Sequence, residues 1–89
     1  MSAPAAPGHW RDLLGVLVTI MNQPNPDHSE GRAAAQVNAA TALIKHGNDK
    51  QIESALAFLR DGALGNRGFG NTQRVLACTI LLEYESEQV

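Results

Sequence analysis

The sequence predicts an all-α fold: a compact four-helix domain, arranged either as a bundle or as two stacked antiparallel helical hairpins. Apolar residues recur at helical spacing in four segments, and helix caps or helix breakers separate these segments. The hydrophobic share of 44% comes mainly from Ala, Leu, Val and Ile, which suit closely packed helices. A chain of 89 residues fits one domain, which we expect over 9–89 behind a flexible segment over 1–8.

The first predicted helix covers 9–23. Its apolar residues fall three or four positions apart: Trp10, Leu13, Leu14, Leu17 and Met21. The prolines of "NQPNPD" end this pattern, because proline disfavours helical backbone in the residue before it. Residues 14–21 are also β-branched enough to form a strand, and periodicity does not separate the two structures in so short a run. The single Trp of the chain, Trp10, either plugs the end of the core or offers an exposed anchor, and we expect the core position.

The second predicted helix covers 28–46. Asp27 and Glu30 stand at N-cap and N3 spacing, which predicts that the aspartate caps the helix and the glutamate reaches back to it. The apolar stripe of this helix consists of Ala33, Val37, Ala40, Thr41 and Ile44. Gly47 closes the helix at a position where we expect a left-handed residue. His28 could join the two carboxylates in a metal site, but capping explains them without a metal, so we predict none.

The third predicted helix follows at the corner "HGND". Asn48 and Gln51 repeat the cap and N3 spacing, which indicates a capping box. The apolar face consists of Ile52, Ala55, Leu56 and Leu59. The helix is expected to end near Asp61 and Gly62.

The fourth predicted helix begins where Asn71 or Thr72 can serve as the N-cap. Its run "VLACTILL" is apolar nearly all the way round, which predicts that this helix is the central and most buried element. Cys78 is then a small buried hydrophobe and not a nucleophile. The glutamates of "EYESEQV" oppose the helix macrodipole, so we expect the C-terminal turn to fray.

A weak internal repeat connects the two halves of the chain. "VNAATALIKH" aligns with "VLACTILLEY", and "RDLLGVLVTI" aligns with "KQIESALAFL", at offsets of about 38 and 39 residues. This pattern of two helical hairpins resembles the HEAT and armadillo class of helical repeats. The resemblance implies stacked hairpins whose surfaces bind other proteins.

Composition and charge argue against several classes of function. The formal net charge is −2 with acidic and basic residues interspersed, so the basic face of a nucleic-acid-binding protein is missing. The longest apolar run is too short to span a membrane, and no secretion signal is visible, so we expect a cytoplasmic protein. The single cysteine forms no intramolecular disulfide framework. No catalytic set or cofactor motif is recognisable, and we predict neither an enzyme nor a cofactor.

The stretch "LGNRGFGNTQR" over 64–74 is the candidate binding site. Its glycines lie just before a predicted helix, where backbone N–H groups can hold an anion. Yet the loop lacks the Lys and hydroxyl pair of a phosphate loop and follows a helix instead of a strand. Phe69 can project into a partner or fold back on the core, and inward packing is the usual outcome under a long loop. Arg67 is the better candidate for a surface contact.

We therefore expect a small non-catalytic module that binds another protein, as an adaptor, an inhibitor or an assembly subunit. The predicted binding residues are Asn66, Arg67, Phe69 and Arg74, together with the exposed side of the third helix. One alternative is a nucleic-acid-binding regulator that uses a helix-turn-helix-like hairpin around "HGND". Another is a self-assembling subunit, because the first and last helices are apolar enough to expose a homo-oligomeric surface.

Overall fold

The computed structural model describes residues 7–88, and their side chains from Trp10 onward. This part of the chain contains four α-helices and no strand: α1 (Pro7–Met21), α2 (Glu30–His46), α3 (Asp49–Ala63) and α4 (Asn71–Gln88). The all-α prediction is confirmed, and residues 14–21 are helix. Residues 1–6 of the predicted flexible segment 1–8 lie outside the described residues. Pro7 and Gly8 belong to α1.

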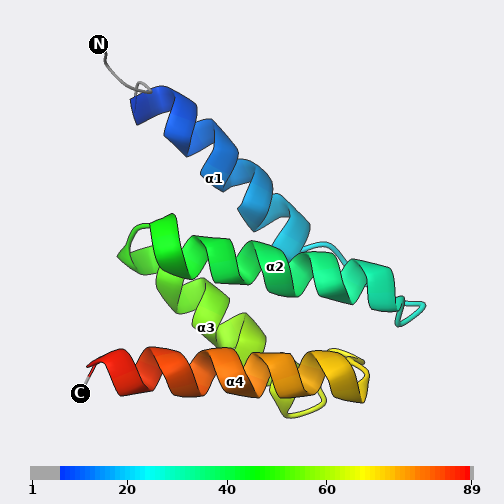
Figure 1. Ribbon diagram of the computed structural model, residues 1–89. Helices are drawn as coiled ribbons and strands as arrows, with labels where there is room; N and C mark the ends of the chain where they lie inside the picture. The colour runs from blue at the N-terminus through cyan, green and yellow to red at the C-terminus, as the bar shows by residue number, and fades with distance from the viewer. Residues whose placement is uncertain (1–6, 89) are drawn as a thin grey trace.

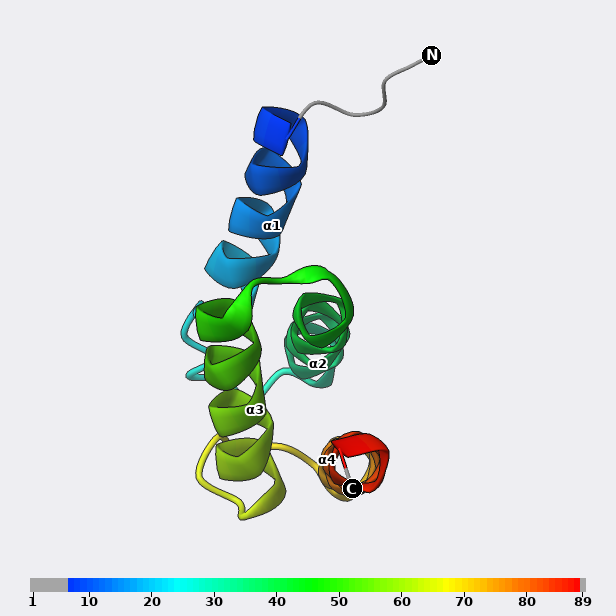
Figure 2. The same cartoon turned by 90° about the vertical axis from the view of Figure 1, so that its left-hand side faces the viewer.

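The helices lie in two layers. α1 and α3 form one layer and run in the same direction, while α2 and α4 lie side by side in the other (Figure 1, Figure 2). The molecule measures 45 × 34 × 19 Å along its principal axes. Its thinnest dimension equals about two helix diameters of roughly 10 Å each. Each helix packs against the next one along the chain, α1 with α2, α2 with α3 and α3 with α4.

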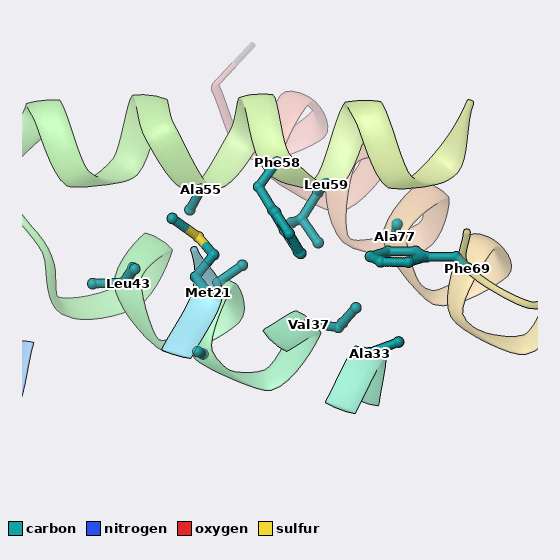
Figure 3. Close-up of a cluster of buried hydrophobic side chains, with 11 residues drawn as sticks. Met21, Ala33, Val37, Leu43, Ala55, Phe58, Leu59, Phe69 and Ala77 are labelled. Carbon is teal, nitrogen blue, oxygen red and sulfur yellow. The ribbon is translucent and has the colours of Figure 1, made fainter. Parts of the chain in front are cut away.

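α2 is the central helix, because it packs against each of the other three and contributes more buried residues than α3 or α4. The buried apolar side chains gather around it (Figure 3): Met21, Ala33, Val37, Ala39, Ala40, Leu43, Ala55, Phe58, Leu59, Phe69 and Ala77. The prediction that α4 is the most buried helix is wrong, since its buried residues are Gln73 and Ala77. α4 lies at an edge of the slab and is covered on one side only (Figure 2).

The N-terminus of α2 differs from the predicted one. Ser29 is the N-cap and not Asp27: the Ser29 hydroxyl accepts from the Arg32 backbone N–H at 3.2 Å. Asn25 holds the cap in place, since its Oδ1 accepts from the Ser29 N–H and its Nδ2 donates to the Ser29 carbonyl, both at 3.0 Å. His28, which was predicted as the first helical residue, has φ 52° and is outside the helix.

The corner between α2 and α3 has the predicted capping box, but the backbone conformation of Gly47 differs from the predicted one. The capping box is confirmed: Asn48 Oδ1 accepts from the Gln51 N–H at 2.8 Å, and Gln51 Oε1 accepts from the Asn48 N–H at 3.0 Å. Gly47, however, has φ −81° and is not left-handed. Glycine is needed there because a Cβ would lie 2.6 Å from the Leu43 carbonyl oxygen and 2.9 Å from Gln51 Cβ.

A side chain of α2 terminates α1. The buried Gln36 donates its Nε2 to the carbonyl oxygens of Ile20 and Met21, each at 3.2 Å, and of Gln23 at 2.6 Å. Carbonyls in the last turn of a helix have no partner within the helix, so Gln36 satisfies groups that water would otherwise have to reach. This capping from a neighbouring helix ends α1 at Met21, two residues before the predicted position 23.

The C-terminal helix continues further than its charge pattern predicts. α4 runs to Gln88, so the fraying expected from its glutamates is not seen over the described residues. Tyr84 is half-buried in this turn and lines hollows shared with Leu56 of α3 and Ile44 of α2. Burial of its ring against both layers offsets the unfavourable charge at the helix end.

Candidate functional site

The glycine-rich loop over 64–70 is held by its backbone. Gly65 and Gly68 have φ values of 95° and 70°, a region that side chains disfavour, so two of the glycines are explained by chain geometry. The Gly65 N–H donates to the Gly62 carbonyl at 3.1 Å, and the Asn66 N–H donates to the Asp61 carbonyl at 2.9 Å. These bonds wind the chain tightly past the end of α3.

Phe69 anchors the loop in the core. It is only 7% exposed, and its ring meets the Phe58 ring at a centroid distance of 5.6 Å and an angle of 61°. The ring also covers Gly62, where a Cβ would lie 2.6 Å from Phe69 Cδ2. The inward orientation expected from the sequence is thus confirmed. Phe69 consequently offers little surface to a partner.

The predicted site arginines are exposed but turn back on the protein. The Arg67 guanidinium lies 4.8 Å from the centroid of the Phe58 ring, and its Nη2 is 3.6 Å from Asp61 Oδ2. Arg74 donates its Nε to the Ala63 carbonyl at 3.0 Å, which satisfies the end of α3. The two arginines therefore stabilise different parts of the same corner.

The remaining features of the loop do not form an anion site. Asn66 is exposed and lies at the rim of a cleft. Beside the first turn of α4, the Glu30 carboxylate comes within 3.2 Å of where a Gly70 Cβ would be. A carboxylate at this place disfavours a bound anion, and the charge of Arg67 is already paired with Asp61.

A polar cleft of about 310 Å³ separates the glycine-rich loop from the loop that joins α1 and α2. The exposed His28 lies against the glycine-rich loop, since a Cβ on Gly68 would be 2.7 Å from His28 Cδ2. The lining consists of Gln23, Pro24, Asn25, Pro26, His28, Gln36, Asn66, Arg67 and Gly68. Its ionisable groups are His28 and Arg67, and the lining contributes no hydroxyl, thiol or carboxylate. This chemistry suits hydrogen bonding more than covalent or acid–base catalysis, which needs a paired group.

Three exposed large apolar residues lie on α1, one of the two helices for which the sequence also allowed an exposed apolar surface. Trp10, Leu13 and Val16 expose 51%, 47% and 55% of their surface, and we call these three residues the α1 stripe. The expectation that Trp10 plugs the core is wrong, because the N-terminal half of α1 projects beyond the other helices (Figure 1, Figure 2). α1 contributes Met21 to the buried core, and four of its side chains pack against that core while partly buried: Leu14, Leu17, Val18 and Ile20.

Cys78 also differs from its prediction. Cys78 is exposed on the outward side of α4 and is not part of the core. The burial of α4 was overestimated because its apolar residues surround the helix, while only one side of it has helices to contact. Val75, Leu76 and Leu82 are exposed as a result.

Comparison with known proteins adds no relative. The chain matches no protein-family model, no curated protein and no solved structure. Among the residues described, no helix combines the length and the apolar character needed to cross a membrane. Over the same residues, no three His, Cys, Asp or Glu side chains gather closely enough to hold a metal ion.

Proposed function

We propose that this chain is a small protein-binding module without chemistry of its own, and that its partner docks on the α1 stripe. The observation that carries the proposal is the exposure of Trp10, Leu13 and Val16 on a helix that projects from the molecule. Clustered apolar residues on a protein surface commonly mark contact sites, and Trp is enriched among the residues that dominate binding energy. Two stacked hairpins, as in the repeat class that the sequence resembles, are also a scaffold for protein recognition.

The charge around the α1 stripe supports an apolar partner. Arg11 and Asp12 follow Trp10 directly, so the neighbourhood is close to neutral. Apolar helix faces of a partner protein suit such a stripe better than a polyanion does. The helix-turn-helix alternative gains little support, because the cations Lys50 and Arg60 of α3 are accompanied by Asp49, Glu53 and Asp61. We place this activity in the cytoplasm, as the single cysteine suggests.

Affinity capture from a lysate of the source cell tests the proposal. Three immobilised proteins are compared after circular dichroism has shown that each is folded: the wild type, Leu13→Gln/Val16→Gln, and the loop control Arg67→Gln. We expect one protein to be retained by the wild type and by the loop control and lost from the stripe variant. Both stripe side chains are about half exposed, so glutamine at these positions should leave the fold intact.

Three outcomes contradict the proposal. Equal retention by the stripe variant shows that α1 is not the docking site, and selective loss from Arg67→Gln moves the site to the glycine-rich loop. Turnover of a small-molecule substrate by the pure protein would show that the protein is an enzyme and not a binding module.

A further inference from the structure

The outward side of α4 is exposed and uncharged. Val75 and Leu82 expose 62% and 68% of their surface, and Cys78 and Thr79 between them are also exposed. These four residues stand at the spacing i, i+3, i+4 and i+7, so they share one side of the helix, which we call the α4 outer face. Gln73 and Ala77, which enter the core, lie on the opposite side.

The α4 outer face has the shape and chemistry for close helix packing. Its middle carries the small side chains of Cys78 and Thr79, and its ends carry the larger Val75 and Leu82. The Thr79 hydroxyl already donates to the Val75 carbonyl at 2.9 Å. Removing water from this face therefore leaves no hydroxyl donor unsatisfied, and burial is not opposed by an unpaired polar group.

We propose that a second copy of this chain covers the α4 outer face, with the two α4 helices antiparallel about a twofold axis. In this register Val75 lies opposite Leu82 of the second copy, and Cys78 lies opposite Thr79 of the second copy. Each contact occurs twice because the interface is isologous. The small residues meet at the centre, where the helices approach most closely.

Charge complementarity selects the second copy and the antiparallel direction. Arg74 and Glu85 are both exposed and lie about three turns apart along one flank of the α4 outer face. Antiparallel pairing about a twofold axis brings this flank of each chain against the same flank of the other, so Arg74 of each chain lies beside Glu85 of the other. Parallel pairing puts the two flanks on opposite sides of the interface, and neither charge then meets its complement. The Nε bond of Arg74 to the Ala63 carbonyl fixes the side chain and leaves its terminal N–H groups for this contact.

Sedimentation equilibrium of the full chain tests the pairing. We expect a monomer–dimer equilibrium for the wild type and a dissociation constant raised at least about tenfold by Leu82→Glu, because a buried carboxylate would face Val75. Leu82 is largely exposed in the monomer, so circular dichroism should be unchanged. A short bis-maleimide should also cross-link two Cys78 residues of the wild type, with Cys78→Ser as the control that cannot react.

A charge exchange identifies the proposed register. Arg74→Glu and Glu85→Arg should each weaken the dimer several-fold, and the double variant should return the dissociation constant to within about threefold of the wild-type value. Glu53→Arg, on α3, is the matched control and should leave it unchanged.

Three results overturn the pairing. They are a monomer at every concentration, a dimer that Leu82→Glu does not weaken, and single charge variants that the double exchange does not rescue. The α1 stripe is not used in this dimer. A failed dimer therefore leaves the lysate capture by α1 unaffected, and a failed capture leaves the dimer unaffected.

Discussion

Gly62 and Phe69 show how one missing side chain positions the glycine-rich loop. The Phe69 ring occupies the space that a Cβ of residue 62 would need, with Cδ2 at 2.6 Å from that position. The ring is buried and packs edge-on against the ring of Phe58. The loop is therefore locked to α3 through a contact that glycine alone permits.

Gly62→Ala should lower the free energy of unfolding by about 1–3 kcal/mol, because the methyl group overlaps a rigid ring. Gly15→Ala is the matched control: it also replaces a helical glycine, but nothing lies within 4 Å of its Cβ position. The control should raise stability by about 0.5–1 kcal/mol through helix propensity. Urea denaturation measures both, and equal changes at the two positions would refute the proposed overlap.

Gln36 is a second residue on which stability depends, because it caps the end of α1. Gln36→Met keeps the length of the side chain but removes the donor that three carbonyls of the α1 terminus share. We expect a loss of about 1–3 kcal/mol, since the buried Met21 carbonyl and the part-buried Gln23 carbonyl lose the amide donor, while the Ile20 carbonyl keeps the Gln23 N–H. The loss should appear in urea denaturation, together with faster amide exchange over 18–23. An unchanged free energy of unfolding would show that water satisfies these carbonyls as well as the Gln36 amide does.

At the scale of the elements, the start of α2 depends on one hydroxyl. Ser29→Ala should cost about 1 kcal/mol, because the Arg32 N–H loses its acceptor. Asp27→Ala should change stability by less than about 0.5 kcal/mol, since Asp27 is exposed and caps nothing. Thermal unfolding of both variants separates the two candidate caps. A larger effect at Asp27 would restore the cap predicted from the sequence.

The helices were predictable from the sequence wherever the signal was local. The capping box of Asn48 and Gln51 depends on residues three apart, and it was found. The predicted end of α1 is two residues too late, because Gln36, which caps this helix, belongs to α2. A contact between distant segments has no signature in a single sequence, so it could not be anticipated.

The candidate site was less predictable than the helices, for a related reason. The glycines correctly indicated a tight loop, and the inward packing of Phe69 was foreseen. Exposure, however, depends on which helix lies in the middle, and apolar periodicity does not contain that information. Trp10 and Cys78 were both assigned to the core, although α1 and α4 are the outer helices of the slab.

The shape of the whole molecule leaves its two outer helices incompletely covered. The radius of gyration is 13.8 Å, compared with about 12 Å for a typical compact chain of this length. A slab with α2 in the middle buries α2 on several sides and exposes α1 and α4 on one. Apolar residues on these two helices then become the natural contact surfaces.

Unequal coverage should appear in hydrogen exchange of the whole chain. Amides over 37–43 in α2 should exchange slowest, near the rate set by global unfolding. Amides over 11–16 in α1 should exchange much faster, because the projecting half of this helix can open without disturbing the core. Mass spectrometry or NMR measures both segments in one experiment. Equal protection of the two segments would contradict the exposed position of α1.

Acrylamide quenching of Trp10 fluorescence tests most directly whether α1 is the docking site. Trp10 is the single Trp of the chain, so its emission reports on the α1 stripe alone when the partner signal is subtracted. In the free protein we predict emission typical of a solvated indole and efficient quenching. Adding the protein captured from the source lysate should shift the emission to shorter wavelength and suppress the quenching. A stable complex in which Trp10 remains fully quenchable would contradict docking on α1.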